Sequence, residues 1–348
     1  MRAIVTTSSI PLLLLATVAL MSCRKNNSAG PPVVTSSPEK KWVVTTVAGD
    51  GSPSFADGLA AMAKFRVPLD AAITPDGIVY VADALNHRIR RIAEGRVSTF
   101  AGFDRQDTVS GIGTAAGFAH PIQIVSDKTG NLYTLDVNDF RVRKITPAAQ
   151  VTVAAGSGIR GFADGRANAA QFGESFGIVT DDNGNIYVSD WENKRIRKIS
   201  VAGDVTTVAG PFEFGPGGIT IDKQGNLYVV DVTNVRVRRI TPAGDISTFA
   251  GSVPGTKDGD ADEAQFSVNM GDIVIDDEGN LYLSDDNRIR KITAQGVVST
   301  IAGSTAGYRD GDGASAKFSA PFGLGIDKMG NIYVADDNNN RIRKISFQ

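Results

Sequence analysis

The chain has 348 residues, of which 42% are hydrophobic and 21% charged, a balance typical of a folded rather than a disordered protein. Its formal net charge is -2, so the surface as a whole offers no electrostatic footprint for nucleic acid. Only one cysteine and two histidines are present, which excludes an internal disulfide framework and a zinc site built from several histidines.

Residues 1–22 have the features of a secretory signal peptide. Arg2 precedes an apolar run, Ile10 to Met21, that is too short to span a bilayer. The run ends at Cys23 in a Leu-Met-Ser-Cys sequence that resembles a bacterial lipobox, and this resemblance implies that Cys23 is lipidated and becomes the first residue of the mature chain. An ordinary signal peptide that happens to contain a cysteine is the alternative.

The segment 23–41 is predicted to be the lipidated cysteine and a flexible tether, because residues 24–41 are rich in Ser, Pro, Asn and Lys. We expect export and lipid anchoring in the bacterial envelope. Under the sorting rule for such lipoproteins, Arg24 in place of aspartate implies the outer membrane.

The rest of the chain repeats one pattern six times, and residues 184–210 are a representative copy. A β-branched and aromatic run at 185–189 follows a turn, and residues 194–200 alternate charge with isoleucine, as a strand with one wet face does. Residues 205–209 form a third such run, and the small apolar segment 176–180 suits a buried inner strand. Each unit is therefore predicted to hold four antiparallel strands joined by short turns.

The units align on one aspartate each, followed by a pair of arginines. The aspartates are Asp83, Asp136, Asp190, Asp231, Asp285 and Asp336. The pairs are Arg88/Arg90, Arg141/Arg143, Arg195/Arg197, Arg236/Arg238, Arg288/Arg290 and Arg341/Arg343. Four-stranded units of this length predict a β-propeller. Because the pattern recurs in every unit, we expect Asp–Arg pairing as part of the blade, with the outer arginine of each pair solvated.

Ring closure is the strongest internal test of this interpretation. The last unit stops after its third strand, whereas an isolated copy of the fourth strand lies at residues 43–48. If this copy completes the last unit, the ring closes and no unpaired edge remains. We therefore predict an all-β fold, a six-bladed β-propeller over residues 42–348 that is closed by its N-terminal strand.

The repeated motif G-N-[LI]-Y-V-x-D-x-x-N-x-R-[IV]-R-[KR]-I, followed by V-x-T-x-A-G, resembles the NHL repeat and covers nearly all of residues 42–348. The resemblance implies a six-bladed propeller but no single function. NHL-type propellers include RNA-binding domains, extracellular sensor domains, a peptide-amidating lyase and many bacterial surface proteins.

Long loops with an Asp-Gly turn precede four of the inner strands, whereas the loop before the fourth inner strand, residues 211–215, is nearly absent. Binding residues of propellers commonly lie on such loops. The predicted binding residues on this face are Phe55, Phe162, Tyr308, Arg160 and Arg309.

A second candidate site lies at the central channel, where equivalent positions of the inner strands differ. Asp70, Gln123 and Asp272 stand where the other three units have glycine, and His120, Glu174 and Asn269 fall near the same end. These six residues are candidates for holding a metal or a small polar ligand at the channel mouth, and a water-filled polar funnel is the alternative.

An acidic loop carries Asp258, Asp260 and Asp262 at alternate positions, as a hard cation such as Ca²⁺ or another divalent cation requires. A solvated acidic turn is the alternative, since the loop lacks the mid-loop glycine and distal glutamate of an EF-hand.

The leading functional hypothesis is a monomeric, lipid-anchored, non-catalytic binding or scaffold module for a protein, peptide or glycan of the envelope, requiring no cofactor. The alternative is a divalent-cation-dependent hydrolase or lyase, lactonase-like, with its site at the channel mouth. RNA binding is disfavoured, because the leader denies a cytoplasmic address and the sequence shows no basic face.

Overall fold

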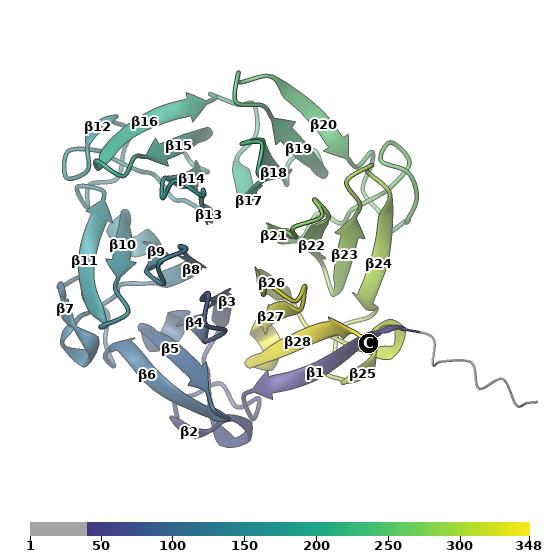
Figure 1. Cartoon of the computed structure of the whole chain (residues 1–348), viewed down its shortest axis with the longest axis horizontal. Helices are drawn as coiled ribbons and strands as arrows, with labels where there is room; N and C mark the ends of the chain where they lie inside the picture. The colour runs from purple at the N-terminus through teal and green to yellow at the C-terminus, as the bar shows by residue number, and fades with distance from the viewer. Residues whose placement is uncertain (1–39) are drawn as a thin grey trace, which may run out of the picture. The chain divides into compact units, whose positions relative to one another are not determined.

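Six antiparallel sheets are arranged as blades around a central axis in the computed structural model, which describes residues 40–348 (Figure 1). The signal segment, Cys23 and the tether up to residue 39 lie outside the described residues. Helical structure in 40–348 consists of single 3-10 turns, and none of it is long and apolar enough to span a bilayer.

Strands at the same position in different blades have similar sequences. Short apolar segments form the inner strands β3 (Pro68–Ile73), β8 (Pro121–Ser126), β13 (Gly177–Thr180), β17 (Pro216–Ile221), β21 (Met270–Ile275) and β26 (Pro321–Ile326), which define blades 1 to 6 in this order. Segments that contain a tyrosine and end at the aligned aspartate form the second strands β4 (Val79–Asp83), β9 (Leu132–Asp136), β14 (Ile186–Asp190), β18 (Leu227–Asp231), β22 (Leu281–Asp285) and β27 (Ile332–Asp336).

The two outer positions follow the same rule. Segments that begin at an arginine form the third strands β5 (Arg88–Ala93), β10 (Arg141–Ile145), β15 (Arg195–Ile199), β19 (Arg236–Ile240), β23 (Arg288–Ile292) and β28 (Arg341–Phe347). β-Branched segments form the outer strands β6 (Arg96–Gly102), β11 (Gln150–Ala155), β16 (Asp204–Ala209), β20 (Ile246–Ala250), β24 (Val298–Gly303) and β1 (Trp42–Ala48).

The 3-10 turns lie in the connections between these strands. They are η1 (Ala60–Met62), η2 (Ala84–Asn86), η3 (Gly113–Ala115), η4 (Val137–Asp139), η5 (Gly313–Ser315) and η6 (Asp337–Asn339).

The N-terminal strand closes the ring, as the sequence predicted. In blade 6, β1 pairs with β28 in a register that places Val44 opposite Ile345. The backbones of Lys41 and Gln348 exchange two further hydrogen bonds, of 2.7 and 2.9 Å. The two chain ends of the ring therefore share one sheet, and the number of blades is six.

Four blades have a fifth, two-residue strand that the sequence analysis did not predict. These strands are β2 (Gly58–Leu59), β7 (Gly111–Ile112), β12 (Gly165–Arg166) and β25 (Gly311–Asp312). Each comes from the loop before its blade's inner strand and covers the outer strand. In blade 5 a single bridge, Gly259 to Val298, does the same. Blade 4 has no such loop, so the prediction that closure leaves no unpaired edge is wrong for β20.

The hydrophobic core lies between blades rather than within them, because one blade cannot bury both of its faces. Each of the six interfaces has its own cluster of buried side chains. The cluster between blades 3 and 4 has only eight buried residues, against eleven to thirteen elsewhere. This interface therefore has the smallest hydrophobic cluster of the six.

Candidate functional site

The antiparallel strand order gives the propeller two different faces. The loops before the inner strands and the turns between second and third strands lie on one face, called here the loop face. The turns between inner and second strands lie on the opposite face, called here the turn face. The predicted sites concern the loop face and the axis.

The aligned aspartates and arginines form buried networks, as blade 3 illustrates. Arg197 has no exposed side-chain surface and donates Nη1 to Asp190 Oδ2 at 2.9 Å and Nη2 to Asp164 Oδ1 at 2.6 Å. Asp164 belongs to the loop and also accepts the backbone N–H of Thr207 on β16 at 3.0 Å. Burial raises the pKa of Asp190, although Asn193 and Arg197 donate hydrogen bonds to it.

The expectation that the outer arginine of each pair is solvated is wrong, since every arginine of the six pairs is partly or fully buried. In blade 3 the reason is the Phe162 ring, which lies 4.1 Å from Arg195 Cζ and 4.8 Å from Arg197 Cζ. Phe55 and Tyr308 cover the arginine pairs of blades 1 and 6 in the same way.

The predicted loop-face binding residues thus have structural contacts. Phe55, Phe162 and Tyr308 are 40–46% exposed above the arginines they cover. Arg160 binds Glu192, with Nε 2.9 Å from Oε2. The exposed Arg309 pairs through its backbone with Lys317. Their role in ligand binding stays a prediction.

At the axis, three of the six predicted channel residues come together. Asp70 accepts the N–H groups of Ala71 at 2.7 Å and of Ile124, in blade 2, at 2.8 Å. Asp272 accepts the N–H of Leu324, in blade 6, at 3.1 Å. Each carboxylate therefore links its own inner strand to the next one. Glycine at position 323 leaves room for this arrangement, because a Cβ there would collide with the Asp70 carboxylate.

These carboxylates have altered acidity. Burial, with repulsion from Asp272, raises the pKa of Asp70 well above its usual value. Burial raises the pKa of Asp272 to about 7, although hydrogen bonds to its carboxylate, including one from the Gln123 amide, act to lower it. Gln123 Nε2 is itself buried without a well-formed hydrogen bond. Two buried carboxylates and one buried amide therefore form a polar cluster at the axis.

The other three predicted channel residues have contacts in their own loops. His120 donates its backbone N–H to Asp136 at 2.6 Å, and burial together with the nearby His87 lowers the pKa of its imidazole. Glu174 lies 3.7 Å from Arg160. Asn269 is exposed and donates its backbone N–H to Ser267 Oγ at 3.0 Å.

The three aspartates of the acidic loop of blade 5 have different surroundings. Asp258 accepts Arg290 Nη2 at 2.7 Å and the N–H of Thr300 at 2.9 Å, so it is the blade 5 counterpart of Asp164. Asp260 and Asp262 are exposed. Over residues 40–348, no group of three or more His, Cys, Asp or Glu side chains is placed to hold a metal ion.

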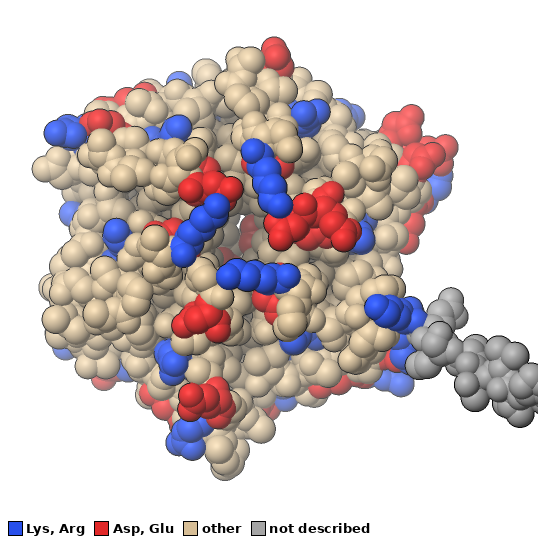
Figure 2. Space-filling view, viewed as in Figure 1, with Lys and Arg blue, Asp and Glu red and all other residues tan. Residues whose placement is uncertain are grey.

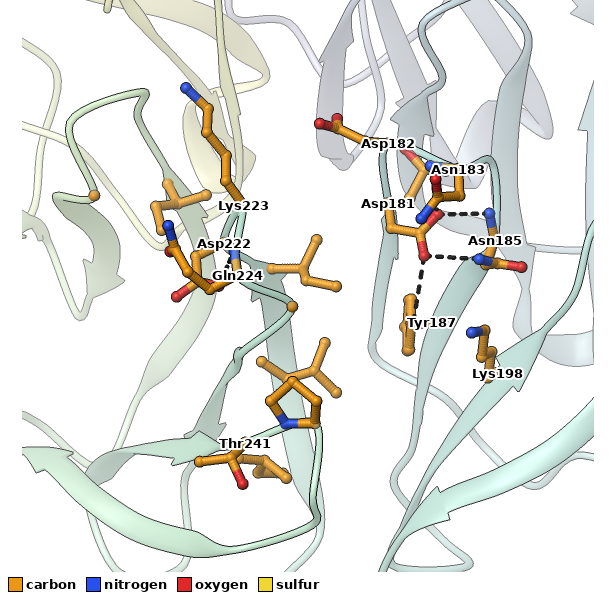
Figure 3. Close-up of a pocket in the computed structure, with 18 of the residues that line it drawn as sticks. Asp181, Asp182, Asn183, Asn185, Tyr187, Lys198, Asp222, Lys223, Gln224 and Thr241 are labelled. Atoms are coloured by element: carbon orange, nitrogen blue, oxygen red, sulfur yellow. Dashed lines mark hydrogen bonds between the residues drawn. The ribbon is translucent and has the colours of Figure 1, made fainter.

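Sequence reasoning missed a cleft of about 710 Å³ on the turn face, between blades 3 and 4 and extending to the first turn of blade 5 (Figure 3). Figure 3 shows Asp181, Asn185 and Tyr187 of blade 3 on one side, and Gln224 and Thr241 of blade 4 on the other. The polar residues that line it are Thr180, Asp181, Asp182, Asn183, Asn185, Tyr187, Lys198, Asp222, Lys223, Gln224, Thr241, Asp276, Asp277 and Glu278.

The walls of the cleft are rigid turns. Asp181 accepts the N–H of Asn183 at 2.9 Å, Asn185 Nδ2 at 2.8 Å and the Tyr187 hydroxyl at 3.3 Å. Gly184 completes the turn at a φ of +81°, which a residue with a side chain rarely adopts. The Asn183 and Gln224 side chains stay exposed, so their amides are available to a ligand.

The charges at the rim are mostly paired. Lys128 lies 2.8 Å from Asp182 and Lys223 lies 2.8 Å from Asp277, so each pair joins neighbouring turns. Lys328 donates to the Pro75 carbonyl oxygen at 3.1 Å. Figure 2 shows basic and acidic side chains side by side around the central opening. Carboxylates outnumber lysines in the cleft itself, which disfavours an anionic ligand.

The cleft exists because the loop before β17 is short. In other blades this loop reaches the turn between the third and outer strands, as Ala60 does by donating its N–H to the Gly95 carbonyl at 2.8 Å. Blade 4 has only residues 211–215 in this place, so Thr241 and Pro242 remain as a wall of the cleft. The shortness of this loop can be recognised in the sequence, and it is the feature from which the cleft could have been predicted.

Comparisons with known proteins bear on the repeat and the fold. Residues 65–92 and 177–199 match the family model described as NHL repeat. The chain is 28% identical over 150 residues to the protein SUPPRESSOR OF QUENCHING 1, chloroplastic, of Arabidopsis thaliana, which covers 40% of this chain and 14% of that protein. It is 28% identical over 369 residues to Teneurin-3 of Mus musculus, covering 87% of this chain and 13% of that protein.

Solved structures show the same architecture. A Bacteroides thetaiotaomicron protein of unknown function aligns with a TM-score of 0.72 at 23% identity, over 89% of this chain and 77% of that one. An auxiliary nutrient binding protein of the same organism gives 0.69 at 21%, with the same coverage. A gluconolactonase of Xanthomonas campestris gives 0.59 at 11%, over 88% and 89%. These identities are low, so the likeness concerns the fold alone.

Proposed function

Starting from a chain that carries NHL repeats in a closed six-bladed propeller, we propose a non-catalytic binding module that takes a neutral, hydroxyl-rich ligand, such as a glycan of the cell envelope, in the cleft between blades 3 and 4. The observation that carries the proposal is the cleft, where exposed amides, carboxylates and one tyrosine ring line a volume of about 710 Å³. Hydroxyl groups both donate and accept hydrogen bonds, so they match a mixture of amides and carboxylates.

Two further observations support binding of this kind. The cleft has an excess of carboxylates, which disfavours phosphate-bearing and other acidic ligands. Two structural neighbours are described as auxiliary nutrient binding proteins of Bacteroides, at 21% and 18% identity. Lipid anchoring through Cys23 and an outer-membrane location are part of the proposal and would hold the module where such ligands occur.

The binding proposal is tested by removing both free amides with the double substitution Asn183→Ala, Gln224→Ala. Titration calorimetry against a panel of neutral and acidic oligosaccharides should show binding of a neutral one, weakened about 10- to 30-fold in the variant, since two hydrogen bonds of about 1 kcal/mol each are lost. Met329→Ala is the matched control, because Met329 holds the Gln224 position in the corresponding turn of blade 6. Equal binding by variant and control contradicts the proposal.

Anchoring has a separate test in Cys23→Ala. Cells fed a labelled fatty acid should label the natural protein, and the variant should lose both the label and its partition into detergent. A labelled variant contradicts the assignment of Cys23.

The axis cluster is the observation that favours a second candidate, a divalent-cation-dependent hydrolase or lyase. The residues present fit a cation poorly. Ionised carboxylates with free lone pairs are what a divalent ion requires. Asp70 and Asp272 have raised pKa values, and backbone N–H groups already bind their oxygens. Elemental analysis decides between the candidates, because a stoichiometric metal that is lost in the Asp70→Ala, Asp272→Ala double variant would favour the enzyme.

A further inference from the structure

Four blades show how this propeller completes its outer edge. A loop aspartate binds the buried second arginine of the pair and the backbone N–H of a threonine on the outer strand. The aspartates are Asp57, Asp164, Asp258 and Asp310, with Thr99, Thr207, Thr300 and Thr46. In each case the threonine hydroxyl donates to the same carboxylate.

Blade 4 has the arginine and the threonine of this arrangement but lacks the aspartate. Arg238 and Thr248 lie opposite each other in the same register as Arg197 and Thr207 of blade 3. The Arg238 side chain is 19% exposed, against 0% for Arg197, and its Nη1 donates to the Thr248 hydroxyl at 2.8 Å. The hydroxyl thus takes the place that the carboxylate has in the other blades.

The outer edge of blade 4 is also open along its backbone. β20 ends its sheet without a fifth strand, and its residues 246–248 are exposed. The N–H of Thr248 lies on this open edge, because the equivalent N–H of Thr207 donates outward to the loop at 3.0 Å. An open edge of this kind pairs readily with an added strand.

Blade 2 shows what the chain does when the loop supplies no carboxylate. Its loop has no aspartate on Arg143, which instead donates to the carbonyl oxygens of Gly117 and Val109, both at 3.1 Å. The residue opposite Arg143 is Val153 rather than threonine. Blade 4 differs, because it has neither the loop nor the aspartate and yet retains the threonine.

The loops of the other blades also indicate which residues an added strand would bring. In three of them an aromatic ring two residues before the aspartate stacks on the first arginine, as Phe162 does on Arg195. The carbonyl between them accepts the second arginine, as Ala163 does from Arg197 at 2.7 Å. In blade 4 no described aromatic ring covers Arg236, whose Nε is buried without a hydrogen bond.

We propose that the outer edge of blade 4 is a docking site for an extended acidic peptide segment of a partner protein. The segment pairs with β20, and its carboxylate binds Arg238 and the N–H and hydroxyl of Thr248. An aromatic residue two positions earlier stacks on Arg236. The site lies on the outer edge of the blade whose turn at Thr241 forms one wall of the cleft, and it adds a protein partner to the proposed ligand-binding role.

The probe is a synthetic peptide with the sequence of residues 158–168, the blade 3 loop, compared with the same peptide carrying Asp164→Asn. Fluorescence anisotropy with the full chain should show at least tenfold tighter binding of the aspartate peptide, since hydrogen bonds to a charged group are the strong ones. Peptides that bind alike, or that both fail to bind, overturn the proposal. Acetate that competes at the same concentration as the peptide also overturns it, because no strand is then needed.

Two substitutions locate the site. Arg238→Met should weaken peptide binding at least tenfold, and Thr248→Val, which imitates blade 2 on an exposed residue, should weaken it several-fold. Thr207→Val is the matched control in blade 3, where the chain's own loop occupies the edge, and it should leave binding unchanged. Unchanged binding in both blade 4 variants overturns the proposal. Sedimentation that shows a dimer dependent on Arg238 would identify the occupant as a second copy and overturn the assignment to another protein.

Discussion

Blades 3 and 4 are neighbours built from the same repeat, yet only blade 3 completes its outer edge with its own chain. In blade 3 the loop supplies Asp164, and Arg197 becomes a buried structural residue. In blade 4 the short segment 211–215 supplies no carboxylate to Arg238, so Arg238 and Thr248 remain accessible. The comparison shows that the loop, rather than the repeat itself, decides whether the second arginine is fully buried or partly exposed.

The largest difference between the two blades is expected when the second arginine, Arg197 or Arg238, is replaced and the free energy of unfolding is measured. Arg197→Met removes a buried donor from Asp190, from Asp164 and from two carbonyl oxygens. We expect it to lower the free energy of unfolding by about 3–5 kcal/mol, as is usual when one partner of a buried ion pair is removed. Arg238→Met should cost only about 1–2 kcal/mol, because Arg238 is 19% exposed and its hydrogen bonds go only to Asp231 and Thr248.

Urea unfolding followed by tryptophan fluorescence measures both variants against the natural chain. Equal losses in the two blades would mean that the loop network adds nothing to the stability of blade 3.

The inner strands provide a second comparison, because blades 3 and 4 have glycine at the position where blade 5 has Asp272. The pKa of Asp272 is raised to about 7 by burial, above the value near 3.9 of an unfolded chain. The folded state therefore holds this proton more tightly, and the resulting stability is present below pH 4 and is lost as the pH rises through about 7. Between pH 5 and 8 the loss should be about 3 kcal/mol, at about 1.4 kcal/mol for each pH unit up to about pH 7.

Asp272→Asn should flatten this pH dependence, because asparagine keeps an oxygen for the Leu324 N–H and has no proton to lose. Thermal unfolding at a series of pH values is the measurement. Asp262→Asn, on an exposed carboxylate, is the control and should leave the slope as it is. A slope that survives in Asp272→Asn would assign the dependence to other buried carboxylates.

The smallest effect concerns the aromatic residue that blade 3 has and blade 4 lacks. Phe162→Ala removes a ring 4.1 Å from Arg195 Cζ, which should cost about 1 kcal/mol of stability, as cation–π contacts at exposed sites do. Ile159→Ala in the same loop is the control, since Ile159 is 60% exposed. If envelope pull-downs are lost in Phe162→Ala while stability is unchanged, the ring acts in binding rather than in the blade.

The fold was predictable because the same pattern of strands and turns recurs six times in the sequence. The aligned aspartates gave the blade count, and residues 43–48 showed which strand closes the ring. Comparing equivalent inner-strand positions also brought out Asp70, Gln123 and Asp272, which the structure places together.

The rest depended on contacts between distant residues. Arg197 is buried because Asp164, 33 positions earlier, folds over it, and no repeat pattern reports such a contact. The cleft arises from a loop that is missing, so no residue in the sequence marks it directly. The loop before β17 was recognised as short, but what its absence exposes follows only from the packing of the neighbouring blades.

The closure of blade 6 has a consequence for biosynthesis. β1 leaves the ribosome before every other strand of the ring, and its partner β28 leaves last, so the first strand made is the last to find its place. Val44 is fully buried in the finished blade. Until β28 is available, its side chain is exposed to water and to other chains. Joining Lys41 to Gln348 and opening the chain between two other blades would let every blade form from contiguous sequence, and such a circular permutant should refold faster than the natural chain.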